Sequence, residues 1–498
     1  MKTLTLAIMI VLCLLFFKSK AQNYFNNRYD LFGKADASAN VFMFNNQYFV
    51  SAGGLNPPQT ELSLSVLKLD LNGIQLKYTH DFITNNFFYS TLSKGTVKIN
   101  DSVLCTTGFR TNASASYGYL YWYKTNLDSI KYKEYGYSNK INFIYTQLLY
   151  ANKYHYLIGS TDSLYTNQNI LLIKTDTVGN EIWKKKIGIV GMDENAYSID
   201  TLQGQLIIAG NRVVHGTSST DGFVMRLDTS GNIVWQKIVN TNAGYGVCKA
   251  LTLKDGNVLV YNRLKMYDAG SITYNRFLIQ KITPNNTLLW QKTYNASNAE
   301  ADCIVAIENT QGNIVIAGQK GATDYSCVGT VNILNQNGDS LFYKEFYKEL
   351  GSQNYFRDVI QTTDKGYCFA GFLIPVFANG GTGTEDIWLL KVDSNFCESA
   401  LPCGSVVGIS EHEVIEGGLK IYPNPAANEL YFVCNFDNAI TLKIHLYDLS
   451  GRLLKEETLI NTKKTQKIDL QDLMSGVYIY KIIEGNTIIK TSKIIILK

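Results

Sequence analysis

Charged residues and prolines are scarce in this 498-residue sequence: 18% of the residues are charged and 7 are proline. The 46 basic residues exceed the 42 acidic ones by four. Three of those lysines, Lys2, Lys18 and Lys20, lie at the N-terminus, so the remaining chain carries 43 against 42, or +1. A nucleic-acid-binding protein needs a strongly basic face, which this balance does not indicate. The hydrophobic content of 46% excludes a disordered chain.

Histidines and catalytic motifs are also lacking. The five histidines are dispersed, and none has the His-x-His or His-Glu-x-x-His spacing that binds a metal. The sequence contains no Gly-x-Ser-x-Gly elbow, no P-loop and no dinucleotide-binding fingerprint. We therefore expect no metal site, no cofactor and no catalytic residue that a motif would identify.

The sequence has one long apolar run, at the N-terminus. It extends from Leu4 to Phe17, about 14 residues, whereas a transmembrane helix needs about 20. A basic residue precedes the run, and a small-residue exit leads to Ala21 and Gln22. This pattern predicts a signal peptide over residues 1–21, cleaved between Ala21 and Gln22, on a chain that does not span a membrane.

Nine cysteines are present, and removal of the signal peptide with Cys13 leaves eight in an exported chain. Disulfides are permitted outside the cytoplasm. Cys397 and Cys403 flank a short loop that closes easily, so we predict a disulfide between them. The other six are scattered, mostly in apolar strands, and are expected to be buried thiols.

The middle of the chain repeats about every fifty residues. A short apolar strand that ends in a small residue recurs seven times, in steps of 55, 51, 51, 52, 56 and 53 residues. The residues that end these strands are Gly53, Gly108, Gly159, Gly210, Asn262, Gly318 and Gly371. Seven copies at this spacing indicate a tandem array of one structural unit.

A second element keeps the same spacing. A strand contains a basic residue, an Asp or Asn follows two positions later, and a Gly-containing turn leads to an aromatic strand, as in Arg226, Asp228, Gly231 and Trp235. Such a turn is typical of a β-hairpin. Four strands per unit predict an all-β chain whose residues 22–396 form a seven-bladed β-propeller. The seventh unit lacks its outer strand, so we expect the segment 23–30 to complete it and close the ring.

The composition changes after the repeats. Residues 397–418 are rich in Gly, Ser and acidic residues, which predicts a linker. Residues 419–498 alternate apolar and polar positions between Gly turns, which predicts a small immunoglobulin-like β-sandwich of about seven strands. Its distinctive residues are Tyr422, Pro423, Asn424, Pro425, Gly451, Arg452, Gly476 and Tyr478.

This module resembles the type A sorting domain of the Bacteroidota type IX secretion system. The resemblance implies that the signal peptide leads the chain to the periplasm and that an outer-membrane translocon then reads the C-terminal domain. It also implies cleavage by a sortase-like peptidase, after which the protein is released or stays attached to the cell surface.

The loops around one mouth of the propeller are the expected ligand site. They are rich in Asn, Ser, Thr, Gly and Tyr, a composition suited to hydrogen bonding and stacking. Two functions stand open: a non-enzymatic module that binds glycan or protein, or acts in adhesion, and a carbohydrate-active hydrolase with two carboxylates at the mouth. The candidate residues in these loops are Asp162, His215, Asp221, Asp268, Asp324 and Asp386.

Overall fold

The fold is known from a computed structural model. It describes residues 23–31, 33, 35–55, 62–81, 87–90, 94–112, 115–162, 168–189, 191–214, 220–240, 247–268, 271–294, 301–321, 326–349, 351–376, 383–399, 419–422, 426–434, 441–448, 452–460, 465–484, 487–496 and 498.

Over these ranges the secondary structure is β-strand without α-helix, which confirms the all-β prediction. None of the described residues belongs to a helix with the length and apolarity needed to cross a membrane. The chain divides into two compact units, Met1–Ser405 and Val406–Lys498. The predicted linker limits and the signal peptide stay predictions, because 1–22 and 401–418 lie outside the described residues.

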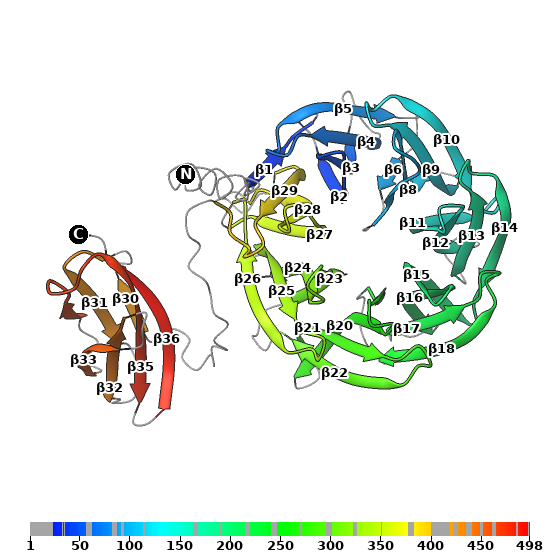
Figure 1. Cartoon of the computed structure of the whole chain (residues 1–498). Helices are drawn as coiled ribbons and strands as arrows, with labels where there is room; N and C mark the ends of the chain where they lie inside the picture. Colours follow the sequence, from blue (N-terminus) through cyan, green and yellow to red (C-terminus); the bar gives the residue numbers. More distant parts are fainter. Residues whose placement is uncertain are drawn as a thin grey trace, which may run out of the picture. The chain divides into compact units, whose positions relative to one another are not determined.

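The first unit is a ring of seven blades, as predicted (Figure 1). The first blade consists of β2 (Asp36–Phe44), β3 (Gln47–Leu55), β4 (Leu62–Leu69) and β5 (Gln75–Asp81). The second consists of β6 (Phe87–Ser90), β7 (Thr96–Lys98), β8 (Val103–Thr111), β9 (Ser116–Lys124) and β10 (Ser129–Tyr135). The third consists of β11 (Ile141–Tyr150), β12 (Tyr154–Asp162), β13 (Asn169–Asp176) and β14 (Glu181–Ile187), and the fourth of β15 (Met192–Leu202), β16 (Gln205–Val214), β17 (Thr220–Leu227) and β18 (Ile233–Asn240).

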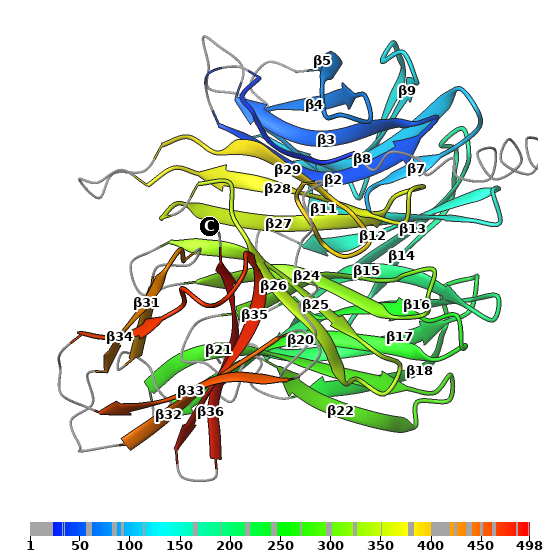
Figure 2. The same ribbon diagram turned by 60° about the vertical axis from the view of Figure 1, so that its left-hand side comes forward.

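The last three blades follow the same antiparallel order (Figure 2). The fifth blade consists of β19 (Lys249–Thr252), β20 (Val258–Asp268), β21 (Ser271–Ile282) and β22 (Leu288–Tyr294). The sixth consists of β23 (Ala301–Glu308), β24 (Ile314–Gly321), β25 (Cys327–Leu334) and β26 (Ser340–Phe346). The seventh consists of β27 (Gln353–Gln361), β28 (Tyr367–Ile374), β29 (Asp386–Val392) and β1 (Phe25–Tyr29).

The N-terminal strand closes the ring. β1 pairs antiparallel with β29, from Phe25 opposite Lys391 to Tyr29 opposite Ile387. The first described strand therefore supplies the outer strand that the seventh repeat lacks, as the sequence predicts. Because β29 gains a partner, the last blade does not present an unpaired edge.

The hairpin turns confirm the interpretation of the Asp-x-x-Gly pattern. Asp228 accepts hydrogen bonds on Oδ1 from the backbone amides of Ser230 (2.9 Å) and Asn232 (2.8 Å). Gly231 has a φ of 79°, a conformation that glycine adopts without steric cost. The side chain thus replaces backbone partners in a turn that would otherwise expose its amides.

Tyrosines of the outer strands join each of three blades to the next one. In each case the hydroxyl donates a hydrogen bond to the carbonyl oxygen of the turn glycine in the following blade. The pairs are Tyr29 with Gly73 (2.6 Å), Tyr135 with Gly179 (2.7 Å) and Tyr294 with Gly338 (2.6 Å). Since Tyr29 lies on β1, the closing strand makes the same contact with the first blade as the outer strands make within the ring.

The basic residue of the repeat serves the same junctions. It extends from the third strand of one blade and donates to a backbone carbonyl in the turn of the next. The contacts are Lys68 Nζ to Thr125 (2.7 Å), Arg226 Nη1 to Pro284 (2.9 Å) and Lys281 Nζ to Gln336 (3.1 Å). These positive charges are therefore structural, which explains why they recur without making the protein basic.

The second unit is a two-sheet β-sandwich of seven strands, as predicted. One sheet contains β30 (Leu419–Tyr422), β31 (Glu429–Cys434) and β34 (Thr465–Asp469), and the other contains β32 (Thr441–Tyr447), β33 (Leu453–Ile460), β35 (Gly476–Glu484) and β36 (Thr487–Ile496). Alternate residues of both sheets fill its core, among them Phe432, Ile444 and Ile482. This core is separate from the cores between the propeller blades.

Replacement of Phe25 by alanine tests the closure. Phe25 is 7% exposed and packs edge-to-face on Tyr48 at 5.7 Å between ring centroids. A Cβ on Gly73 would lie 2.7 Å from its ring, so the two blades are in tight contact there. We expect Phe25→Ala to lower the free energy of unfolding by about 3 kcal/mol, because a buried aromatic is lost.

Urea unfolding followed by tryptophan fluorescence measures this loss, since all five tryptophans lie in the propeller repeats. Asn23→Ala, which removes an exposed hydrogen bond to Asn72 (3.1 Å), is the control and should change stability by less than about 0.5 kcal/mol. Equal midpoints for Phe25→Ala and the parent would show that β1 does not hold the ring together.

Candidate functional site

The innermost strands of several blades carry one extra residue each, at a β-bulge that faces the channel region of the ring. The pairing of β11 with β12 skips Tyr145, that of β15 with β16 skips Tyr197, and that of β27 with β28 skips Arg357. β2 and β23 have bulges at the corresponding places. A bulge redirects a side chain and is a frequent device near binding sites.

The recurring glycine of the sequence repeat is explained by these bulges. A Cβ on Gly210 would lie 1.9 Å from the carbonyl oxygen of Asn195, and one on Gly371 would lie 1.6 Å from that of Tyr355. The backbone of the inner strand therefore approaches too closely for any side chain. In the fifth blade β19 begins at Lys249, opposite Tyr261, so its ladder does not reach the next position, where the repeat has Asn262.

Five aromatic side chains lie in sequence across the second, third and fourth blades. We call them the aromatic band: Tyr89, Phe109, Phe143, Tyr145 and Tyr197. Successive ring centroids are 4.8 Å (Tyr89 to Phe109), 4.8 Å (Phe109 to Phe143), 6.1 Å (Phe143 to Tyr145) and 5.0 Å (Tyr145 to Tyr197) apart. Tyr89 is 40% exposed and the others are partly exposed. A row of partly exposed aromatic rings is suited to stacking.

Asp162, one of the predicted candidates, lies beside this band. Its side chain is 2% exposed, and neither carboxylate oxygen has a hydrogen-bond partner among the described residues. Burial raises the pKa of Tyr145 to about 12, and the charge of Asp162 adds to this rise. Asp162 is therefore a buried carboxylate beside the aromatic band and is not open to a bound chain.

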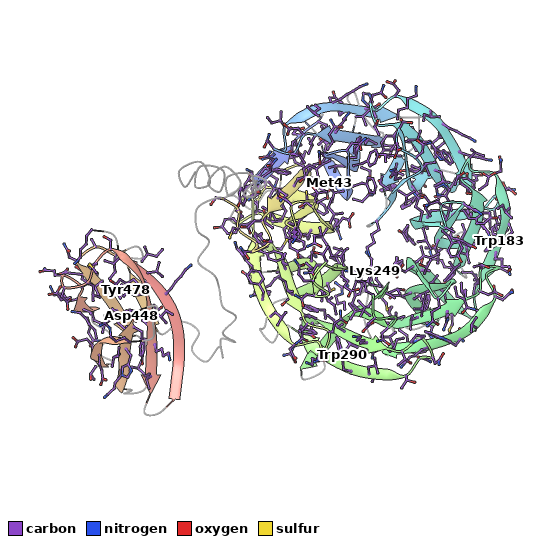
Figure 3. All side chains as sticks on the ribbon, viewed as in Figure 1. Met43, Trp183, Lys249, Trp290, Asp448 and Tyr478 are labelled. Atoms are coloured by element: carbon purple, nitrogen blue, oxygen red, sulfur yellow. The ribbon has the colours of Figure 1, made fainter. Side chains whose placement is uncertain are left out.

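Charged groups converge deeper in the ring. Lys249, at the start of β19, is 2% exposed and lies toward the middle of the ring in Figure 3. Burial lowers the pKa of Lys249 to about 7, with Asp358 opposing and Lys94 and Arg357 reinforcing this shift. Lys249 lines a cavity of about 270 Å³ to which the inner strands of the second to fifth blades contribute.

The seventh blade also combines aromatic and charged groups. The Arg357 guanidinium lies 5.7 Å from the ring centroid of Tyr355 and 5.0 Å from that of Phe372. Burial lowers the pKa of Arg357, and burial raises the pKa of Glu385 against the effect of the Arg357 charge. These contacts hold the guanidinium by cation–π attraction.

None of the three predicted acids with described side chains is an open carboxylate. Asp221 forms an ion pair with Arg212 (3.4 Å), Asp386 accepts a hydrogen bond from Arg28 Nε (2.6 Å), and Asp162 is buried. Asp268 ends β20, and its side chain is outside the described part of the structure, as are His215 and Asp324. The signal-cleavage residues Ala21 and Gln22 are outside it as well.

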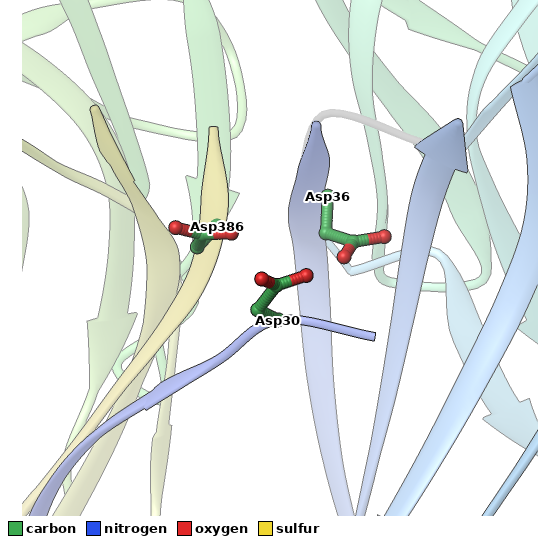
Figure 4. A group of neighbouring side chains, drawn as sticks. All are labelled: Asp30, Asp36 and Asp386. Atoms are coloured by element: carbon green, nitrogen blue, oxygen red, sulfur yellow. The ribbon is translucent and has the colours of Figure 1, made fainter. Parts of the chain in front are cut away.

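Asp386 instead belongs to an acidic cluster at the closing junction (Figure 4). The carboxylate oxygens of Asp30, Asp36 and Asp386 lie within 4.8 Å of one another, close enough to share a cation. Burial raises the pKa of Asp386, and the charge of Arg28 opposes this rise. The sequence predicts no metal site, and Arg28 already offsets part of the charge of these acids.

Cys397 is disulfide-bonded. Its predicted partner Cys403 lies outside the described residues, so their pairing stays a prediction. Five other cysteines are buried free thiols, as expected: Cys105, Cys248, Cys303, Cys327 and Cys368.

In the second unit the described sorting-motif residues occupy strand ends. Tyr422 ends β30, and Gly476 begins β35. Arg452 donates from its backbone amide to Asp448 Oδ1 (3.0 Å), and the Tyr478 hydroxyl donates to the Met474 carbonyl (2.8 Å). Pro423, Asn424, Pro425 and Gly451 lie outside the described residues.

The aromatic band and Lys249 were not predicted from the sequence. The sequence contains one signal that could identify part of the site. Each bulged residue precedes a repeat glycine by 14 positions, or by 13 in the case of Tyr197: Ala39 before Gly53, Tyr145 before Gly159, Tyr197 before Gly210, Ile304 before Gly318 and Arg357 before Gly371. Comparison at that offset selects Tyr145, Tyr197 and Arg357. Tyr89 and Phe109 have no such periodic relation to the others.

Gly210→Ala tests the link between repeat glycine and bulge. The new methyl group would meet the Asn195 carbonyl, a backbone atom that cannot rotate away. We expect the free energy of unfolding to fall by about 3 kcal/mol or more. In the control, Gly383→Ala, the nearest atoms would be Pro375 side-chain carbons 3.2 Å away, so urea unfolding should shift by less than about 1 kcal/mol. Equal losses in both variants would contradict the close-approach explanation.

Solved structures similar to this chain include several that cover most of it. The polysaccharide lyase Uly1 has a TM-score of 0.45 and 10% identity, with 76% of this chain and 94% of that chain covered. The β-propeller domain of the trilobed protease from Pyrococcus furiosus has a TM-score of 0.42 and 9% identity, covering 74% and 99%. The α-L-arabinanase of Penicillium chrysogenum has a TM-score of 0.38 and 9% identity, covering 74% and 97%. No curated protein matches the sequence.

The C-terminal unit has a clear family. Residues 420–497 match the family model described as the secretion system C-terminal sorting domain. The match covers the strands from β30 to β36, the unit that the sequence identifies by the same motif. Such a domain indicates secretion and attachment to the cell surface. Residues 420–497 are thus a type IX secretion C-terminal sorting domain, carried by an all-β chain whose other unit is a seven-bladed propeller.

Proposed function

We propose that the propeller is a non-enzymatic binding module, exported by type IX secretion, that takes a glycan chain on its aromatic band. The observation that carries this proposal is the unbroken series of five partly exposed rings from Tyr89 to Tyr197. Sugar rings have apolar C–H faces that pack flat on aromatic side chains, and their hydroxyls seek polar acceptors at the edges.

The condition of the acids supports binding over hydrolysis. A glycosidase needs two carboxyl groups about 5–10 Å apart, both able to reach the substrate. Among the candidates with described side chains, Asp221 and Asp386 are held by arginines and Asp162 is buried. None of these three is an exposed acid poised for proton transfer.

Tyr89→Ala tests the band with little risk to folding, because Tyr89 is 40% exposed. The full chain is first screened on a glycan array, and the affinity of the best ligand is then measured by calorimetry. We expect Tyr89→Ala to weaken binding about threefold to tenfold, since one stacking surface is lost.

The matched control is Tyr343→Ala on β26, which removes a ring 42% exposed on an outer strand of the sixth blade. It should leave the affinity unchanged. The proposal is wrong if no glycan binds, if both variants weaken binding equally, or if the chain cleaves the bound glycan.

Deletion of residues 419–498 tests the export route. We expect the truncated propeller to remain in the periplasm of a host that has the type IX translocon, because the signal for the second step is lost. Fractionation and surface proteolysis measure this, with the full chain carrying Tyr343→Ala as the export-competent control. Normal surface display of the truncated chain would refute the dependence on the sorting domain.

A further inference from the structure

The acidic cluster of Asp30, Asp36 and Asp386 lies where the ring closes (Figure 4). Asp30 directly follows the closing strand β1, Asp36 begins β2 of the first blade, and Asp386 begins β29 of the seventh blade. One carboxylate oxygen from each residue lies within 4.8 Å of the other two. A single ion at this place would therefore contact all three elements that meet at the junction.

Two of the three carboxylates are fully buried. Asp36 and Asp386 are each 0% exposed, whereas Asp30 is exposed. A buried carboxylate is costly unless opposite charge and hydrogen bonds compensate it. Because Asp30 lies at the surface, the cluster can be reached from solvent.

Asp386 supplies the observation that points to a ligand. Arg28 contacts its Oδ2 atom through both Nε (2.6 Å) and Nη2, and Arg28 Nη1 is shared with Glu349 (3.1 Å). The other oxygen, Oδ1, is buried and has no hydrogen-bond partner among the described residues. A buried acceptor of this kind is rare in native proteins and indicates a bound water or ion.

The charges at this oxygen favour an ion over a water. Burial raises the pKa of Asp386, and the charges of Asp30 and Glu349 add to this rise against the effect of Arg28. A water would donate a hydrogen bond to Oδ1 but would leave the repulsion between the carboxylates in place. A cation would satisfy the oxygen and remove the repulsion.

Backbone amides hold the other two carboxylates in position. Asp30 Oδ1 accepts a hydrogen bond from the amide of Gly33 (2.5 Å), and Asp36 Oδ2 accepts one from the amide of Leu31 (2.7 Å). The amide of Asp36 itself donates to the carbonyl oxygen of Glu385 on the seventh blade. The donor oxygens are thus positioned by the fold, which lowers the cost of binding an ion.

We propose that Asp30, Asp36 and Asp386 bind one calcium ion that fastens the closed ring. Carboxylate oxygens suit hard divalent cations, and calcium takes oxygen ligands at about 2.3–2.6 Å, so opposite ligands are about 4.6–5.2 Å apart. The spacing of the three oxygens is within this limit, and waters complete the shell. Magnesium demands a near-ideal octahedron and loses its waters reluctantly, so two buried carboxylates favour calcium.

The site goes beyond glycan binding and gives the ion a structural role. β1 pairs with β29, and the ion joins the end of β1 and the start of β29 to the start of β2. The three ligands come together only in the closed ring, so the ion binds the native state and not the unfolded chain. The sequence does not indicate the site, because Asp386 is at the opposite end of the propeller repeats from Asp30 and Asp36.

Thermal unfolding of the full chain in 5 mM calcium chloride and in EDTA tests the site. Tryptophan fluorescence follows the propeller, since all five tryptophans lie in its repeats. We expect calcium to raise the melting temperature by about 2–5 °C. Calorimetry should give one ion per chain with a Kd of about 0.1–1 mM, the range of extracellular calcium modules.

Asp30→Asn is the test variant, because it removes one ligand charge from an exposed residue and keeps the oxygen that accepts from Gly33. It should unfold like the parent in EDTA, and calcium should bind it about tenfold or more weakly. The matched control is Asp101→Asn, whose carboxylate is 94% exposed and paired with Lys98 (2.6 Å). It should respond to calcium like the parent.

Four results would overturn the site. They are no calcium-dependent shift in the parent, a shift retained in Asp30→Asn, an equal loss in Asp101→Asn, and an equal shift in sodium chloride of the same ionic strength, which would show screening of the acids alone. An equal shift in 5 mM magnesium chloride would overturn the assignment to calcium.

Discussion

The contact of one blade with the turn of the next is the interaction on which the whole ring depends. A four-stranded blade has two faces to bury, and it buries them against its neighbours. The tyrosine hydroxyl on the turn glycine carbonyl, seen at Tyr135 with Gly179, fixes the spacing at the outer edge. Tyr29 makes the same contact with Gly73, so the closing strand joins the first blade by the chemistry that joins the second blade to the third.

At the centre of the ring a different constraint operates. The inner strands bulge, and their backbone is pressed onto the second strand at Gly159, Gly210, Gly318 and Gly371. Each bulge turns one side chain out of the regular alternation. The same bulges therefore explain why small residues recur in the sequence. They also explain why aromatic and basic side chains lie around the axis of the ring.

The fold was largely predictable because repetition amplifies weak signals. One Asp-x-x-Gly turn is common, but its recurrence at Gly73, Gly179 and Gly231, together with seven strands that end in a small residue about every fifty positions, indicates a propeller. The missing outer strand after Asp393 points to the N-terminal segment. The candidate site was predictable only in part. Asp162 follows a repeat strand, but Tyr89 and Phe109 come from the second blade and Tyr197 from the fourth, and no spacing relates Tyr89 and Phe109 to Tyr197.

The sequence by itself determined the number of blades, the closing strand, the β-sandwich and the secretion address, because each is encoded by residues near one another in the chain or at a constant period. Only the tertiary structure decided what faces the axis. Lys249 is an ordinary lysine at the start of a short strand until the ring brings Lys94, Arg357 and Asp358 around it. The physical reason is that charge, burial and stacking depend on distance in space, and a closed ring places residues of the second, fifth and seventh blades closer together than any reading along the chain would indicate.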